Sequence, residues 1–326
     1  MTSAQNNPPP LLSVHNLTKR FKARQGFRSR WITAVENVSF HICPRETYAL
    51  VGESGSGKST TGRALLRLTE ATSGQAHFAG QDIFSLPAKA LRELRKDIQM
   101  IFQDPLSSLD PKRSIGYSVA EPLIIHGLDD PAGRRAKVAG LLARLGFSPG
   151  DADRYPHEFS GGQRQRIGIA KALILDPRLI VCDEPVSALD VSIQSQILNL
   201  LLELQRERGF SYLFIAHDLG VVRHIADRIG VMYRGRIVEE APTQTLFSSA
   251  RHPYTRFLLA SILPAHPRQK KNLVLPVRSG PDAGSVPGAG CVYSSKCPFA
   301  ISLCFEHAPV DRIIGDQHRI ACHVCD

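Results

Sequence analysis

The segment Gly52-Glu-Ser-Gly-Ser-Gly57-Lys58-Ser59 constrains the fold of this chain more than any other feature of its sequence. It matches the pattern G-x-x-x-x-G-K-[ST], follows the apolar run Thr47–Val51 and precedes an apolar helical pattern that begins near Thr60. Glycines allow successive backbone N–H groups to face one point, and the positive end of a helix dipole adds to their attraction for phosphate. The pattern predicts a strand, a phosphate-binding loop (P-loop) and a helix, in that order.

The loop also predicts which residues contact a nucleotide. Lys58 is expected to reach the β- and γ-phosphates, and the Ser59 hydroxyl is expected to bind Mg²⁺. The other predicted phosphate contacts are Gly52, Ser54, Gly55, Gly57 and Thr60. A nucleoside triphosphate with Mg²⁺ is therefore the expected ligand.

A second buried strand is expected at Leu179–Cys182, and it ends on two consecutive carboxylates, Asp183 and Glu184. Asp183 is expected to hold Mg²⁺, directly or through water, and Glu184 to act as the general base on the attacking water. Two solvated acids at an ordinary strand end are the alternative. The presence of Lys58 in the same chain favours the catalytic interpretation.

A third segment, Phe159-Ser-Gly-Gly-Gln-Arg-Gln165, places a hydroxyl and two glycines before an apolar helix. Such a helix start attracts anions because its first N–H groups have no partner within the helix. A chain with one P-loop and a second helix start of this kind suggests that the second one contacts the nucleotide of a neighbouring subunit. The predicted contacts are Ser160, Gly161, Gly162 and Gln163.

The identity and order of these motifs resemble those of the ATP-binding subunits of ABC transporters. Gln103, within Phe102-Gln-Asp-Pro-Leu-Ser-Ser-Leu-Asp-Pro111, is similar to the glutamine of the Q-loop. Ser187–Asp190 is similar to the D-loop, and His217 to the switch histidine. The resemblance implies ATP and Mg²⁺ as cofactors, with Gln103 sensing Mg²⁺ and water, His217 touching the γ-phosphate, and Asp190 among the nucleotide contacts.

This sequence departs from the family pattern in two places. Phe159 replaces the commoner leucine before the signature segment, and Cys182 occupies a position usually taken by a small residue. Neither change removes a catalytic group. The resemblance further implies that Phe21 stacks on adenine, with Phe27 or Trp31 as alternatives and a purely structural Phe21 as the third possibility.

Further similarity narrows the family to dipeptide, oligopeptide and nickel importers, because of the Q-loop and signature segments, His252-Pro-Tyr-Thr255 and the cysteine-rich tail. The resemblance implies an ATPase that energises peptide import at the cytoplasmic face of the inner membrane, as a peripheral subunit. It also implies a second ATP-binding subunit in a hetero- or homodimer, two transmembrane permease subunits and an extracytoplasmic substrate-binding protein. The chain is more similar to the second ATPase subunit of such pairs, and nickel or another small solute is the alternative cargo.

The expected fold is α/β: a P-loop NTPase (RecA-like) ABC nucleotide-binding domain with a helical subdomain and a small cysteine-rich C-terminal appendage. Strand and helix patterns alternate from Leu179 to Ala216, which favours a parallel sheet, and Gly209 is expected to end the intervening helix. We expect the ATP-binding domain at 1–264, with its helical subdomain at about 89–158. A Pro/Gly linker and the cysteine-rich region are expected at 265–326.

Five of the seven cysteines lie between Cys291 and Cys325. The chain begins without a recognisable export leader, so we expect reduced thiols or metal ligation rather than disulfides. The spacings C-x5-C, C-x6-C and C-x17-C are long for a zinc knuckle, which favours an iron–sulfur cluster over zinc, with unligated thiols as the alternative. The predicted ligands are Cys291, Cys297, Cys304 and Cys322.

The net charge of +10 could attract nucleic acid, anionic lipid or phosphorylated ligands without deciding among them, and a solvated basic face is the favoured interpretation. A soluble ABC ATPase acting on nucleic acid is therefore a second hypothesis, although such proteins usually carry two nucleotide domains or a long coiled coil. A metal-sensing regulator is a third hypothesis, secondary to the complete set of hydrolytic motifs. We expect no nucleic-acid partner, and apolar runs such as Phe257–Leu263 are far shorter than the ~20 residues that a membrane crossing needs.

Overall fold

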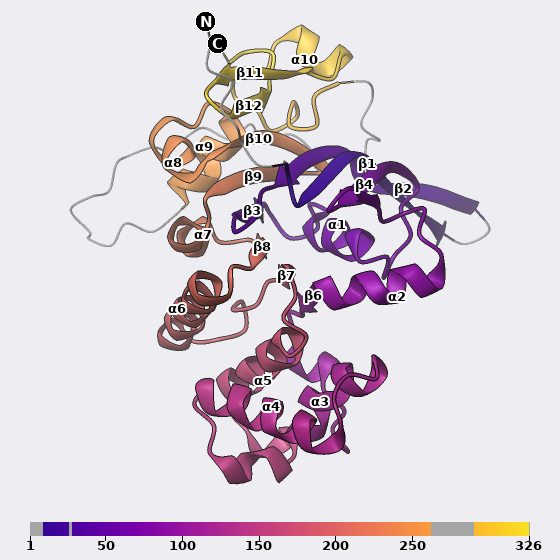
Figure 1. Cartoon of the computed structure of the whole chain (residues 1–326). Helices are drawn as coiled ribbons and strands as arrows, with labels where there is room; N and C mark the ends of the chain where they lie inside the picture. The colour runs from indigo at the N-terminus through magenta and orange to yellow at the C-terminus, as the bar shows by residue number, and fades with distance from the viewer. Residues whose placement is uncertain (1–8, 26–27, 262–289, 326) are drawn as a thin grey trace, which may run out of the picture. The chain divides into compact units, whose positions relative to one another are not determined.

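The computed structural model describes residues 9–25, 28–261 and 290–325 (Figure 1). The chain divides into two compact units. The helical unit contains Cys43–Glu46 and Ser85–Phe214, and the P-loop unit contains Pro9–Ile42, Thr47–Phe84 and Ile215–Asp326. No helix of the described residues is long and apolar enough to cross a membrane.

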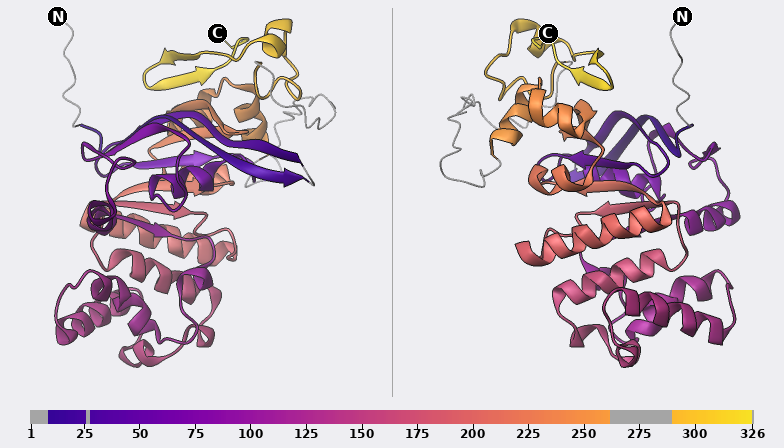
Figure 2. Two further views of the ribbon diagram at one scale, coloured as in Figure 1. Left: turned by 90° about the vertical axis from the view of Figure 1, so that its right-hand side faces the viewer. Right: turned by 60° about the vertical axis from the view of Figure 1, so that its left-hand side comes forward.

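An antiparallel four-stranded sheet in the order β2-β1-β4-β5 forms one part of the P-loop unit. Its strands are β1 (Leu12–Gln25), β2 (Arg28–Ile42), β4 (Ser73–Phe78) and β5 (Gln81–Asp82). The β1–β2 pair runs as a long ribbon (Figure 2). Alternate apolar residues such as Leu12, Val14, Phe40 and Ile42 are buried, as the period of two requires.

A second sheet in the P-loop unit carries the P-loop. Strand β3 (Thr47–Val51) pairs in parallel with β9 (Arg228–Tyr233), and β9 pairs antiparallel with β10 (Arg236–Pro242). Every residue of β3 and β9 is buried, which is typical of strands covered on both faces. The helices among the described residues of this unit are α1 (Lys58–Leu65), α7 (Leu219–Ile225), α8 (Thr243–Ser249), α9 (Pro253–Ala260) and α10 (Ser302–Glu306).

A small C-terminal appendage extends this second sheet. Strand β12 (His318–Ala321) pairs with β10, and β11 (Asp311–Gly315) pairs with β12. These two strands and α10 form the appendage, drawn in yellow in Figure 2. The appendage is therefore joined to the rest of the P-loop unit by backbone hydrogen bonds as well as by side chains.

The helical unit contains the helix-rich insertion that the sequence indicates near residues 89–158. Its elements up to the signature segment are α2 (Ala88–Asp97), β6 (Ile98–Ile101), α3 (Ile115–Ile125), α4 (Pro131–Arg144) and the short 3₁₀ helices Pro105–Ser108, Pro149–Asp153 and Pro156–Glu158. The residues Val138, Leu141 and Leu142 of α4 are buried, and their spacing of three and one forms an apolar stripe on one face of the helix. Figure 1 shows α3 and α4 beside α5 (Gly161–Leu173).

The remaining elements of the helical unit alternate as the sequence indicates. Strand β7 (Leu179–Asp183) pairs in parallel with β6, α6 (Val191–Arg208) follows β7, and β8 (Ser211–Ala216) begins in this unit. Gly209 adopts φ 73° at the end of α6, a left-handed conformation that glycine accepts without a Cβ clash. The parallel pairing and the helix end are both confirmed.

Some sequence-based boundaries differ from the structure. Strand β2 is much longer than the apolar run Val38–Ile42 with which it ends, because hydrogen bonds to β1 continue through polar residues that carry no apolar alternation. The insertion also contains the strand β6, which a mostly helical sequence pattern does not predict. The expected domain boundary at 264/265 and the Pro/Gly linker, apart from Gly290, lie outside the described residues.

Candidate nucleotide-binding site

The P-loop connects β3 to α1, as its position between an apolar strand and a helix predicts. The Lys58 ammonium group folds back over the loop and donates to the carbonyl oxygens of Gly52 at 2.7 Å and Glu53 at 2.9 Å. It also lies 3.4 Å from the Ser56 hydroxyl, and the residue is only 4% exposed. A buried ammonium held by the loop itself is positioned at the point where phosphate oxygens are expected.

Three glycines give this loop its shape, and they do so for different reasons. A Cβ on Gly52 would lie 2.1 Å from the Met232 carbonyl oxygen, and one on Gly57 would lie 2.2 Å from that of Ala34. A Cβ on Gly55 would meet no described atom within 4 Å. All three have positive φ, so close packing fixes two glycines, whereas the third faces open space.

The start of α1 fits a phosphate group. Gly57 is the N-cap residue, so no side chain of its own can cap the helix, and its φ is 106°. Anionic ligands are attracted to such a helix start by its N–H groups and by the helix dipole. The residues predicted to contact the phosphates and Mg²⁺ all lie in this loop and at the start of α1, and their contact with ATP stays a prediction: Gly52, Ser54, Gly55, Gly57, Lys58, Ser59 and Thr60.

Tyr254 contacts the P-loop, a role that the sequence analysis did not assign. Its hydroxyl accepts a hydrogen bond from the Glu53 N–H at 3.0 Å, and its side chain is fully buried. The ring lies 4.5 Å from that of Tyr233 and 5.4 Å from that of Tyr293, measured between centroids. The motif His252-Pro-Tyr-Thr255 contains this tyrosine, but the motif alone does not reveal its hydrogen bond to the P-loop.

A second link to the P-loop comes from the turn between β9 and β10. The Gly235 N–H donates to the Ser56 carbonyl at 2.8 Å, and the Gly235 carbonyl accepts from the Glu36 N–H at 2.8 Å. Glu36 belongs to β2, so the loop is tied both to this turn and, through it, to the antiparallel sheet. These bonds fix the loop from outside its own motif.

The predicted carboxylates lie in the helical unit, at the end of β7. Asp183 is fully buried, and its negative charge, after burial itself, raises the pKa of the neighbouring Cys182 thiol. The Gln103 amide donates to the Glu184 carboxylate at 3.4 Å. The structure thus places Gln103 and Glu184 side by side although they are 81 residues apart.

The backbone of Glu184 has a conformation that the sequence did not reveal. Its φ is 47°, in the left-handed region that a residue with a long side chain rarely adopts. Ser187 holds this conformation, because its N–H and its hydroxyl both donate to the Glu184 carbonyl, at 3.3 Å and 3.1 Å. Strain of this kind, about 1–3 kcal/mol, persists where the surroundings enforce it and is common at functional sites.

The signature segment forms the start of α5. Ser160 is its N-cap residue, with its hydroxyl accepting from the Gln163 N–H at 3.3 Å. The Gln163 side chain in return accepts from the Ser160 N–H at 2.9 Å, which completes a capping box. Both side chains therefore accept hydrogen bonds from backbone N–H groups at the start of the same helix.

The two glycines of the signature segment differ in what surrounds them. A Cβ on Gly162 would lie 2.7 Å from Cγ2 of Ile193, so α5 and α6 could not pack as they do. A Cβ on Gly161 would meet nothing closer than Cδ2 of Leu189 at 3.8 Å. Gly161 is thus the glycine whose absent side chain leaves room at the surface, whereas Gly162 is needed for packing.

The remaining predicted residues lie at surfaces of the two units. Phe21 is 42% exposed on β1, with the Lys19 ammonium 4.8 Å from its ring, and its alternative Trp31 is 62% exposed on β2. His217 follows β8 in the P-loop unit, and Asp190 is the N-cap residue of α6 in the helical unit. The other alternative for the adenine contact, Phe27, lies outside the described residues.

The departure at Phe159 has a packing explanation. Its buried ring contacts that of Phe147 edge to face at 5.7 Å and lies 4.6 Å from the Arg154 guanidinium. Arg154 in turn pairs with Asp151 at 2.9 Å and Glu158 at 3.3 Å. An aromatic ring at this position therefore ties the loop before the signature segment to the end of the helical insertion.

The C-terminal cysteines come close together in the appendage. The thiols of Cys304, Cys322 and Cys297 help to raise the pKa of Cys291 to about 11, although burial is the larger cause. A hydrogen bond from Cys325 lowers the pKa of Cys322 to about 6. Among the described residues, however, no group of three or more His, Cys, Asp or Glu side chains could hold a metal ion, so the iron–sulfur or zinc prediction has no support from the structure.

A parallel βα unit with a phosphate-binding loop, a buried carboxylate at a strand end and a second glycine-containing helix start define an ABC-type nucleotide-binding domain. Comparison with protein families agrees, because residues 35–187 match the ABC transporter family. Residues 238–304 match the C-terminal region of oligopeptide/dipeptide transporters. The chain belongs to the ATP-binding proteins of the ABC transporter family.

Individual relatives support this assignment. The chain is 46% identical to the oligopeptide transport ATP-binding protein AppF of Bacillus subtilis, over 99% of both chains. It is 56% identical to the glutathione import ATP-binding protein GsiA of Salmonella paratyphi A, over 80% of this chain and 42% of GsiA. The chain therefore spans about two fifths of the length of the glutathione import relatives that it matches.

Solved structures show the same fold. The ATP-binding cassette MJ0796, solved as a dimer in a post-hydrolysis state with ADP and Pi, has a TM-score of 0.64 and is 30% identical. It covers 71% of this chain, and the alignment includes 98% of the cassette. The cassette cbiO1 of Clostridium perfringens, part of the transporter complex cbiONQ, has a TM-score of 0.63 and is 27% identical over 74% of this chain and 91% of its own.

Proposed function

We propose that this chain is the ATP-hydrolysing subunit of an ABC importer for short peptides. The observation that carries this proposal is the presence in one chain of the ABC motifs and of a region shared with oligopeptide and dipeptide transporters. Relatives named for oligopeptide transport and for the import of glutathione, itself a peptide, support the same cargo. Nickel or another small solute is the alternative cargo.

In this proposal ATP is held by the P-loop and stacks on Phe21. Mg²⁺, bound by Ser59, Gln103 and Asp183, would neutralise charge on the phosphates and align them for attack. Glu184 takes a proton from the attacking water, while Gln103, at 3.4 Å from its carboxylate, orients it. His217 donates a hydrogen bond to the γ-phosphate.

The proposal also assigns the partners. A second ATP-binding subunit, identical or homologous, places its nucleotide against Ser160, Gly161, Gly162, Gln163 and Asp190 of this chain. Two transmembrane permease subunits at the cytoplasmic face of the inner membrane contact the helical unit, where Tyr117, Ile124 and Ile125 of α3 are 39–51% exposed. An extracytoplasmic substrate-binding protein delivers the peptide.

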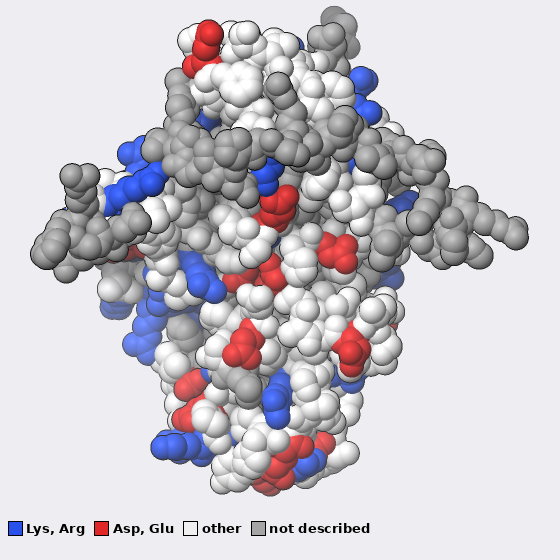
Figure 3. All heavy atoms as spheres, turned by 180° about the vertical axis from the view of Figure 1, so that it is seen from behind, with Lys and Arg blue, Asp and Glu red and all other residues white. Residues whose placement is uncertain are grey.

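Figure 3 shows one face of the described residues, and this face carries charges of both signs. Asp and Glu side chains lie among the Lys and Arg side chains on the face of the described residues seen in Figure 3. Binding to nucleic acid usually requires a basic stripe that follows the phosphate backbone. The choice of a transport ATPase therefore rests on the family matches and not on the net charge.

The general-base assignment is tested with Glu184→Gln in the assembled transporter. We expect ATP binding to be retained, hydrolysis to fall by roughly 10²–10³ and uptake of labelled dialanine to stop, because a group acting in the transition state is removed. Glu203→Gln, an exposed change of the same chemistry on α6, is the control and should keep normal rates. Near-normal hydrolysis by Glu184→Gln would contradict the assignment. Uptake of Ni²⁺ instead of dialanine by the unchanged transporter would make nickel the cargo.

Action of the signature segment on a partner's nucleotide is tested with Ser160→Arg. A bulky cation at this helix start should block ATP-driven dimerisation while the isolated subunit still binds ATP, as measured by sedimentation and by nucleotide titration. Loss of ATP binding by the monomer would show that Ser160 acts within its own chain.

A metal centre at the C-terminal cysteines stays a hypothesis. If Cys291, Cys297, Cys304 and Cys322 hold an iron–sulfur cluster or zinc, protein purified without oxygen or chelators should contain the metal, and Cys297→Ser should lose it. Metal-free protein whose tail thiols all react with an alkylating reagent would support unligated cysteines instead.

A further inference from the structure

A cavity of about 500 Å³ lies within the P-loop unit, between the antiparallel sheet, β10 and the C-terminal appendage. This volume falls in the range of ~300–1000 Å³ that is typical of small-molecule sites. Part of the lining is apolar, including Val238, Val292 and Val310. The polar lining comes from Asn16, Glu36, Asn37, Ser39, Arg236, Asp311 and Arg319.

The charges of the lining balance, since two carboxylates face two guanidinium groups. A polyanion such as a nucleotide would need a surplus of positive charge, and a metal ion a surplus of carboxylates. A neutral pair of each sign instead suits a ligand that carries one positive and one negative group. The charge pattern therefore points to a zwitterion.

Arg236 is a cation of the lining whose guanidinium is only partly used in hydrogen bonds with the described residues. Arg236 donates from Nε to the Glu36 carboxylate at 3.0 Å, and this is its only side-chain ion pair or hydrogen bond with the described residues. The two terminal nitrogens of its guanidinium are thus available for a ligand. A guanidinium edge of this kind binds a carboxylate through two parallel hydrogen bonds.

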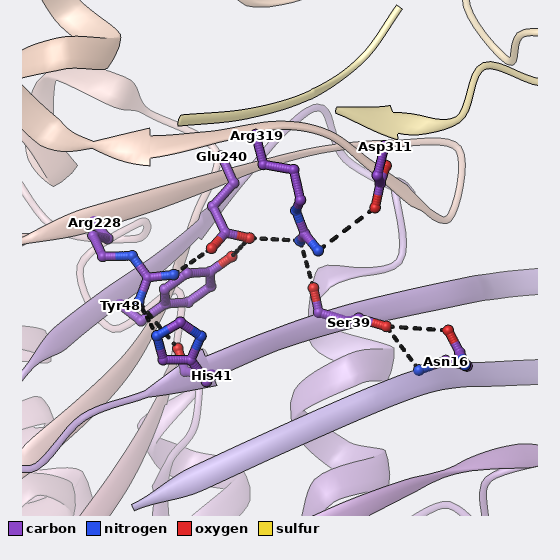
Figure 4. Close-up of polar contacts among 8 residues, drawn as sticks. All are labelled: Asn16, Ser39, His41, Tyr48, Arg228, Glu240, Asp311 and Arg319. Carbon is purple, nitrogen blue, oxygen red and sulfur yellow. Dashed lines mark hydrogen bonds and ion pairs between the residues drawn. The ribbon is translucent and has the colours of Figure 1, made fainter. Parts of the chain in front are cut away.

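Asp311 is an anion of the same lining, and it lies beside a network of ion pairs. Arg319 is held by the Glu240 carboxylate at 2.6 Å and by the Ser39 carbonyl, and Glu240 also pairs with Arg228 and accepts from the Tyr48 hydroxyl (Figure 4). Asp311 lies on the outer side of this network, 3.5 Å from Arg319 through one oxygen. It is 52% exposed, and its second oxygen has no bond with the described residues. That oxygen can accept from an ammonium group.

Two walls of the cavity connect directly to the P-loop. The Arg236–Glu36 pair flanks Gly235, which accepts from the Glu36 N–H and donates to the Ser56 carbonyl of the loop. On the appendage side, Val292 precedes Tyr293, whose ring packs on Tyr254, the residue whose hydroxyl holds the Glu53 N–H. A ligand that shifts either wall therefore acts on the residues that shape the phosphate cradle.

We propose that this cavity binds a short peptide through its free ammonium and carboxylate ends, and that its occupancy changes the affinity of the P-loop for nucleotide. The charges alone define a zwitterion, and the choice of a peptide among zwitterions rests on the proposed function. Such a site would let the ATPase respond to the peptide on its own side of the membrane.

The first test is calorimetric titration of the full chain with dialanine. We expect binding that weakens about tenfold or more for N-acetyl-dialanine and for dialanine amide, because each blocked end removes one charge. Equal binding of the blocked compounds, or no binding of dialanine at roughly 10 mM, would overturn the proposal.

Variants locate the site. Arg236→Gln and Asp311→Asn should each weaken dialanine binding about tenfold, since each removes one charged anchor from a partly exposed position. Arg256→Gln is the matched control, because Arg256 is exposed on α9 and does not line the cavity. If all three variants bind like the unchanged chain, the cavity is not the site.

Coupling is tested by titrating a non-hydrolysable ATP analogue with and without saturating dialanine. A change in nucleotide affinity of about threefold or more is expected, with the same factor in the reverse experiment. Tyr254→Phe should reduce this factor while keeping dialanine affinity within about twofold, because it removes one of the two links to the loop. Identical nucleotide affinity with and without dialanine would remove the regulatory part of the proposal.

Failure of the cavity as a peptide site can be distinguished from failure of the importer assignment. Peptide uptake by the assembled transporter without dialanine binding by the full chain would reject the cavity alone. Dialanine binding at Arg236 and Asp311 in a transporter that takes up no peptide would reject the importer assignment and leave the cavity as a zwitterion site.

Discussion

The starts of α1 and α5 look alike in the sequence but differ in the structure. Both follow a segment rich in glycine and serine, and both were expected to face phosphate. The start of α1 has Gly57 as its N-cap and receives no side-chain cap, whereas that of α5 is closed by the capping box of Ser160 and Gln163. The start of α1 therefore leaves its N–H groups for a ligand. The start of α5 already has hydrogen bonds from its own side chains in the absence of a ligand.

The difference has a consequence for binding order. A ligand at α1 meets donors that the loop already orients, so little rearrangement is needed. A phosphate at α5 must compete with, or share, the hydrogen bond between the Ser160 hydroxyl and the Gln163 N–H. Nucleotide should therefore bind the P-loop in the separate subunit, and the signature segment should engage only in a dimer.

The largest expected effect comes from adding one methyl group to the start of α1. Gly57→Ala places a Cβ 2.2 Å from the Ala34 carbonyl at a φ of 106°, so we expect a loss of about 3 kcal/mol in unfolding free energy and of ATP binding. Gly55→Ala is the control, because its Cβ meets no described atom within 4 Å and only the φ of 80° opposes it. Equal losses in urea unfolding for both variants would contradict the packing role of Gly57.

The same comparison can be made at α5. Gly162→Ala should cost about 1–3 kcal/mol, because its Cβ would lie 2.7 Å from a methyl group of the stiff, β-branched Ile193. Gly161→Ala should leave unfolding unchanged yet weaken ATP-driven dimerisation, since its Cβ points where a partner's nucleotide is expected. Normal dimerisation of Gly161→Ala would show that this glycine is not at the interface.

The start of α9 is a third case, and its N-cap residue makes the stability of the chain depend on pH. His252 is the N-cap of α9, accepts from the Tyr254 N–H at 3.1 Å, and is only 1% exposed. Burial lowers the pKa of His252 to about 3, so between about pH 6.5 and 3 the unfolded chain takes up a proton that the native chain refuses. Stability should fall with falling pH by up to about 1.4 kcal/mol per unit.

The measurement is urea unfolding at several pH values for the unchanged chain and for His252→Gln. An amide oxygen can keep the cap without titrating, so the variant should show a shallower dependence below pH about 6.5. Parallel curves for the two proteins would mean that His252 titrates alike in the folded and unfolded chain.

The smallest expected effect concerns the cap of α5 itself. Ser160→Ala should lower the unfolding free energy by about 1 kcal/mol and also weaken ATP-driven dimerisation. Ser114→Ala is the matched control, because Ser114 caps α3 through the Tyr117 N–H at 3.3 Å without any predicted nucleotide contact. Ser114→Ala should show the same stability loss with normal dimerisation, and a dimerisation defect in both variants would reduce Ser160 to a cap.

Much of the fold could be predicted because its signals are local. The apolar strands β3, β7 and β9, the stripe on α4 and the terminating Gly209 are each set by a few neighbouring residues. The short strands β5 and β12 could not be found in this way, since they are strands only because β4 and β10 offer hydrogen-bonding partners. Pairing between distant segments decides such elements, and the sequence pattern does not contain it.

The site shows the same division. The P-loop and the carboxylates follow from motifs, whereas the left-handed backbone of Glu184 depends on two hydrogen bonds from Ser187. Gly161 and Gly162 are adjacent and identical residues in the sequence. Their surroundings differ because Ile193 packs against Gly162, whereas Leu189 is farther from Gly161. Motifs identify the chemical groups, and packing decides what each of them can reach.

The hydrogen bond between the Tyr254 hydroxyl and the Glu53 N–H changes how a minimal version of this protein should be engineered. A fragment limited to the ABC family match, residues 35–187, would contain every letter of the P-loop and lack the tyrosine that supports it. A chimera that replaces the C-terminal region would likewise alter the support through Tyr293 without touching the motif. A working fragment or chimera of this ATPase therefore has to keep the P-loop and the C-terminal region together, because residues of the C-terminal region support the loop that is predicted to bind the phosphates.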